Sequence, residues 1–122
     1  MHDPPALRDP ILAGLALEDG DGPVLRIAGE LARLTGAPLA LLHARPAEPA
    51  ALAARDPARA ALERAAAPLR AAIPVTLHVR ASPSPVRALH EAAEELGASL
   101  VVAGGGAGGV GERLLHAAPC AV

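Results

Sequence analysis

The sequence contains no Phe, Tyr or Trp and no Lys, Asn or Gln, so all 11 of its basic residues are Arg. A folded core must therefore be built from Leu, Val, Ile and Ala, and no aromatic ring is available to stack on a base. The only cysteine, Cys120, has no partner for an internal disulfide, which gives no sign of an oxidising compartment. The N-terminus also lacks the charged and apolar regions of a signal peptide.

An excess of one charge is absent as well. The net charge is −2, and acidic and basic residues alternate along the 122 residues without forming a basic stripe. Such a surface is not expected to hold a nucleic-acid backbone or an anionic membrane. No apolar run approaches the length of a membrane span. We therefore expect one cytoplasmic domain over residues 1–122, with neither a nucleic acid nor a membrane as its partner.

Short apolar runs alternate with amphipathic segments along the chain. The apolar runs predict strands at residues 10–17, 39–44, 73–80 and 99–103, with a final stub at 119–122. Helical spacing predicts helices beginning near residues 21, 57 and 85, and a short helix at 112–117. Residues 45–57 are rich in Pro and Ala and are expected to form a surface connection. This alternation predicts an α/β fold, a doubly wound parallel sheet of five strands with helices on both faces.

Prolines and glycines predict where several elements begin and end. Ser84-Pro85 is a capping residue followed by proline, which is typical of a helix start, and Gly97 is expected to end the same helix. Pro68 is expected to kink the preceding helix or to end it early. Residues 73–80 alternate apolar and polar side chains, as an edge strand does.

A glycine-rich turn, residues 104–111, follows the fourth expected strand. Ligands of parallel α/β sheets bind at the carboxyl ends of the strands, and the N–H groups of a glycine turn can approach a phosphate. The turn matches the dinucleotide fingerprint, but too little chain follows Gly109 to form the second strand of that motif. A P-loop is excluded because the chain has no Lys. The turn is nevertheless the candidate ligand site.

Several stretches of the chain resemble the universal stress protein family. They are ILAG at 11–14, ELARLTGA at 30–37, LLHA at 41–44, ALHEAA at 88–93, ASLVVAG at 98–104 and LLHAAPC at 114–120. The resemblance implies the sheet order 3-2-1-4-5, here with a truncated last strand. It also implies a role in the stress response, frequent homodimers and, in many members, a bound ATP.

The sequence departs from the nucleotide motif that the resemblance implies. ATP-binding members have a carboxylate where this chain has Ala16, and hydroxyl side chains where it has Gly109 and Gly111. Each lost hydrogen bond to a charged phosphate is worth ~1.5–3 kcal/mol. The candidate ATP site is therefore degenerate, and it comprises Gly104, Gly105, Gly108, Gly109, Val110, Gly111, Ala16 and Ala44.

Two functional hypotheses follow. In the first, the chain is a non-catalytic stress-response domain that acts by association with an unidentified protein partner, needs no cofactor and has weak or no nucleotide binding. In the second, it binds ATP or AMP and uses residues 104–111 as the phosphate cradle. No catalytic constellation is present, and the five histidines lack the spacing of metal ligands.

Other polar residues have structural interpretations. His43, at the end of a strand, is expected to make a structural hydrogen bond. Glu91, Glu94 and Glu95 are expected to form a solvated helix face. Asp21 is expected to cap the first helix, although it could instead replace the carboxylate that is missing at the end of the first strand.

Overall fold

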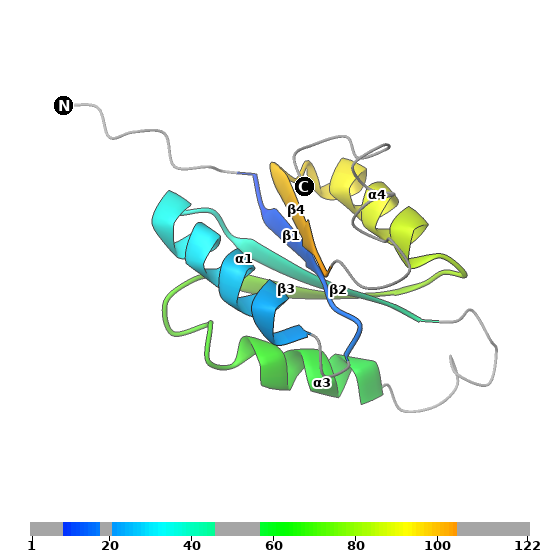
Figure 1. Cartoon of the computed structure of the whole chain (residues 1–122), viewed down its shortest axis with the longest axis horizontal. Coiled ribbons are helices and arrows are strands. Elements are labelled where there is room, and N and C mark those ends of the chain that lie inside the picture. The colour runs from blue at the N-terminus through cyan, green and yellow to red at the C-terminus, as the bar shows by residue number, and fades with distance from the viewer. Residues whose placement is uncertain (1–8, 18–20, 46–56, 105–122) are drawn as a thin grey trace.

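The described part of the chain forms a four-stranded parallel sheet with helices on both faces (Figure 1). The computed structural model describes residues 9–17, 21–45 and 57–104. The strands are β1 (Ile11–Gly14), β2 (Leu39–Arg45), β3 (Val75–Ala81) and β4 (Leu100–Ala103). The helices are α1 (Asp21–Thr35), α3 (Pro57–Ala66) and α4 (Pro85–Leu96). The predicted alternation of strands and helices is therefore confirmed.

The strands lie in the order β3-β2-β1-β4, and every neighbouring pair is parallel. The chain moves outward from β1 through β2 to β3 and then returns to the other side of β1. This order agrees with the first four strands of the order that the family resemblance implies. The strand and helix expected at 119–122 and 112–117 lie outside the described residues, as does most of the expected connection at 45–57.

Two apolar layers cover the sheet because successive side chains of each strand point to opposite faces. Ile11 and Ala13 of β1 pack with α1 and α3, whereas Leu12 packs with α4. Both layers consist of Leu, Val, Ile and Ala, as the lack of aromatic residues requires. Within the described residues, no polar side chain is buried and no helix has the length and apolar character to cross a membrane.

The helices begin and end at the residues where the local sequence signals predict their limits. α3 ends at Ala66, because a proline at position 68 disfavours helical backbone in the residue before it. α4 begins at Pro85, and the side chain of its N-cap Ser84 accepts a hydrogen bond from the backbone N–H of Arg87. Gly97 ends α4 with a φ of +64°, a conformation that favours glycine. β3 lies at one edge of the described sheet, as its alternating pattern predicts.

We expect the substitution Ser84→Ala to lower the free energy of unfolding by about 1 kcal/mol, because the N–H of Arg87 loses its acceptor. Ser84→Asp is the matched control, since aspartate keeps an acceptor oxygen at the N-cap. Urea unfolding measures both variants. Equal stability of the two variants would contradict a capping role for the hydroxyl.

Candidate functional site

The carboxyl ends of β1, β2 and β4 meet at one edge of the sheet, because the three strands are parallel and adjacent. In the register of the sheet, Gly14 at the end of β1 pairs with Leu42 on one side and Ala103 on the other. Three predicted site residues come just beyond these positions: Ala16, Ala44 and Gly104. The fold therefore brings these three residues to the same edge, which we call the carboxyl edge.

The first turn of α1 lies beside the start of the glycine turn. A Cβ atom added to the exposed Gly104 would be 3.6 Å from Cγ2 of Val24. The N-terminus of a helix carries a partial positive charge, which favours anions near it. The other predicted site residues lie outside the described residues, and their part in the site stays a prediction: Gly105, Gly108, Gly109, Val110 and Gly111.

Leu15, the first residue after β1, is held by β2 through both of its backbone groups. Its N–H donates to the carbonyl oxygen of Leu42 at 2.8 Å. Its carbonyl oxygen lies 2.9 Å from Nδ1 of His43. Because a carbonyl oxygen can only accept, Nδ1 carries the proton and donates to it. The hydrogen-bonded structural role expected for His43 agrees with this contact.

Asp21 does not act as the N-cap that the sequence predicted. α1 begins at Asp21 itself, and the carboxylate reaches back toward β1. Its Oδ1 accepts from the backbone N–H of Ala16 at 3.0 Å, and its Oδ2 accepts from that of Leu17 at 2.7 Å. The expectation of capping is therefore wrong, because the carboxylate is taken by two amides that the sheet leaves unpaired.

The same contacts correct the predicted length of the first strand. Residues 10–17 were expected to be extended, but β1 covers only Ile11–Gly14. Beyond Gly14, side chains supply partners for backbone groups that would otherwise continue the ladder. Leu17 has a φ of +63°, which an extended strand cannot accommodate. Sequence reasoning missed this conformation because an aliphatic residue carries no signal for positive φ.

A cluster of charged side chains links β3 to α4, and its Arg80 lies opposite Ala44 in the register of the sheet. Arg80 of β3 pairs with Glu91 and Glu95 of α4, so the acidic face expected to be merely solvated is also ion-paired. The hydrogen bond from Arg80 lowers the pKa of Glu95. Burial, followed by the positive charge of Arg80, lowers the pKa of His78. Exposed ion pairs of this kind contribute little to stability, so we assign this cluster no large part in holding β3 to α4.

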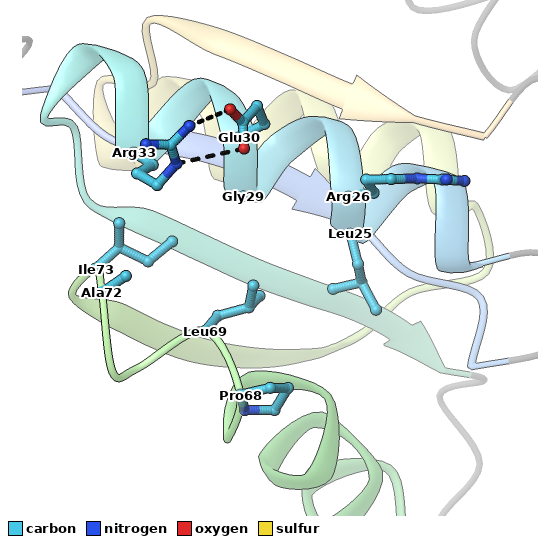
Figure 2. Close-up of a pocket in the computed structure, with 9 residues that line it drawn as sticks. All are labelled: Leu25, Arg26, Gly29, Glu30, Arg33, Pro68, Leu69, Ala72 and Ile73. Carbon is cyan, nitrogen blue, oxygen red and sulfur yellow. Dashed lines mark hydrogen bonds and ion pairs between the residues drawn. The ribbon is translucent and has the colours of Figure 1, made fainter.

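A shallow cavity of about 260 Å³ lies between α1 and the segment that follows α3 (Figure 2). Figure 2 shows Leu69 facing Leu25 and Gly29 of α1, with the ion pair of Glu30 and Arg33 above them. None of the predicted site residues lines this cavity. Over the described ranges, moreover, no group of His, Cys, Asp and Glu side chains is placed to hold a metal ion.

Comparisons with known proteins point to one family. The model of the universal stress protein family matches residues 8–122. A structure from that family in Burkholderia pseudomallei is 29% identical, with a TM-score of 0.80, over 98% of this chain and 96% of that chain. No curated protein sequence matches the chain.

Two further structures have the same fold and hold nucleotides. One is a universal stress protein in complex with cAMP, 23% identical over 94% of both chains, with a TM-score of 0.78. The other is the universal stress protein from Archaeoglobus fulgidus in complex with dAMP, 24% identical over 96% of both chains, with a TM-score of 0.76.

Proposed function

The chain belongs to the universal stress protein family, and on that premise we propose that it is a non-catalytic stress-response domain that binds an adenosine monophosphate at its carboxyl edge. One observation carries the proposal. Three parallel strands end at this edge beside the first turn of a helix, and Gly104 begins the glycine turn there. Such an edge is where ligands bind in open α/β sheets. We propose the cytoplasm as the place of action.

The kind of nucleotide follows from the number of donors that the site can offer. The two nucleotides held by the similar structures, cAMP and dAMP, each have a single phosphate. This chain has glycine at positions 109 and 111, so two hydroxyl donors of the family motif are missing. A triphosphate depends on more such donors than a monophosphate, and each is worth about 1.5–3 kcal/mol. The site therefore favours AMP or cAMP over ATP, with weak affinity.

A second candidate function is association without a nucleotide. It is favoured by Ala16, which leaves the first strand without the carboxylate that the family motif implies at that position. In this case the chain would act through a protein partner, for which a second copy of the same chain is one proposal. Nucleotide titration separates the two candidates.

We expect AMP and cAMP to bind with a Kd of about 0.1 mM, which corresponds to roughly −5.5 kcal/mol. At about 10 mM ligand the native state then gains about 2.7 kcal/mol, which thermal unfolding detects. Isothermal titration calorimetry with AMP, cAMP and Mg²⁺–ATP gives the order of affinities. Absence of any shift with all three would favour association without a nucleotide, and ATP binding more tightly than AMP would contradict the preference for a monophosphate.

A pair of matched variants locates the binding. Gly104→Glu places a negative charge at the carboxyl edge, where a Cβ atom is in ordinary contact with Val24, and should abolish AMP binding by repulsion and by occupying space. Ala71→Glu adds the same charge at an exposed residue shortly before β3, near the amino ends of the strands, and should leave AMP affinity unchanged. Equal loss of affinity in both variants would place the ligand elsewhere.

A further inference from the structure

We propose that Asp21 is a positioning residue that holds Ala16 and Leu17 in the conformation that a ligand at the carboxyl edge meets. The part of this proposal that concerns ligand affinity rests on the proposed function. The part that concerns the backbone stands on the contacts of the ligand-free chain.

The contacts of Asp21 are directed at two successive amides. Each carboxylate oxygen accepts from one backbone N–H, Oδ1 from Ala16 at 3.0 Å and Oδ2 from Leu17 at 2.7 Å. Hydrogen bonds to an ionised acceptor are about twice as strong as neutral ones. The residue before them, Leu15, is held by Leu42 and His43 of β2. The backbone up to Leu15 is therefore hydrogen-bonded to the neighbouring strand, and the next two N–H groups are hydrogen-bonded to Asp21.

Leu17 has a backbone conformation that needs such a partner. Its φ of +63° places an aliphatic residue in the left-handed region, which L-residues with a Cβ atom disfavour. A conformation of this kind persists only where the surrounding contacts determine it. The hydrogen bond from the N–H of Leu17 to Asp21 is one such contact. The partly buried side chain of Leu17 is another, since it packs against the apolar layer on the α1 face of the sheet.

The test uses graded substitutions at Asp21 in the full chain. Asp21→Asn keeps one acceptor oxygen and should retain one of the two bonds, whereas Asp21→Ala removes both. Glu30→Gln and Glu30→Ala are the controls, because they make the same changes of charge in the same helix at an exposed residue whose partner is Arg33. Hydrogen exchange by NMR reports the amides of Ala16 and Leu17, and calorimetry with AMP reports the affinity.

We expect the protection of both amides to fall about tenfold or more in Asp21→Ala, less in Asp21→Asn, and not at all in the Glu30 variants. AMP affinity should fall in the same order, by about tenfold in Asp21→Ala. In a Leu17→Gly background the effect of Asp21→Ala on affinity should shrink, because glycine adopts a positive φ without a steric penalty. This background also serves if Asp21→Ala alone fails to fold.

Unchanged protection of the two amides in Asp21→Ala would overturn the proposal. Lost protection with unchanged AMP affinity would overturn it as well, because the bonds would then be local structure without a role in binding. If the unsubstituted chain binds no adenosine monophosphate, the proposed function fails separately. The exchange of the Ala16 and Leu17 amides then decides by itself whether Asp21 fixes this backbone.

Discussion

Leu41→Ala is expected to lower the free energy of unfolding by about 2–5 kcal/mol. Leu41 lies in β2 between β1 and β3, and its side chain is 0% exposed in the layer between the sheet and the helices α1 and α3. Truncation leaves a cavity, and β2 cannot move to fill it because hydrogen bonds hold the strand on both sides. Because the chain has no aromatic residues, the lining consists of smaller side chains that leave few large groups to swing inward.

The matched control is Leu34→Ala, the same substitution at a residue of α1 that is 67% exposed. Its stability should stay within about 0.5 kcal/mol of the unsubstituted chain. Urea unfolding at constant pH, with the slope compared between variants, measures both changes. A similar loss in the two variants would show that burial of Leu41 is not what stabilises this layer.

Most element limits could be predicted because their signals are local. Both ends of α4 could be predicted from Ser84-Pro85 and Gly97. Helix capping, and the left-handed conformation that ends a helix, depend mainly on the residue at that position. The end of α3 could be predicted from Pro68, which is also a local signal. The parallel sheet followed from the alternation of elements, whereas the strand order came with the family resemblance. That order is confirmed for the four described strands, and the family by the match over residues 8–122.

The end of β1 could not be predicted, because it depends on competition between distant partners. An apolar run through Leu17 favours an extended strand, but the carbonyl of Leu15 is taken by His43, 28 residues away. The sequence favours capping for Asp21, because Asp is a preferred N-cap residue, and contains no signal for the two backward hydrogen bonds that its carboxylate accepts. The sequence therefore predicts that Ala16, Ala44 and Gly104 lie at one edge of the sheet, because parallel strands end together there. The role that it predicts for Asp21 is wrong.

The second large effect is expected at Gly14, where β1 approaches α4. A Cβ atom on Gly14 would lie 2.8 Å from Cδ2 of Leu89, closer than real Cβ contacts allow. Leu89 is buried among alanines of α4, so it can move aside only by disturbing that layer. Gly14→Ala should therefore lower the free energy of unfolding by about 1–3 kcal/mol, as added volume in a packed core does.

Gly22→Ala is the matched control, because a Cβ atom there meets nothing within 4 Å. Both substitutions restrict the unfolded chain to a similar extent, but alanine at Gly22 also raises helix propensity in α1, so the contact with Leu89 needs a separate test. A double-mutant cycle with Leu89→Ala completes the test. Leu89→Ala leaves the space that the new methyl group needs, so the double variant should be more stable than additivity predicts by about 0.5–3 kcal/mol. If the two changes in the free energy of unfolding were strictly additive, the contact between Gly14 and Leu89 would not be what limits the approach of α4 to β1.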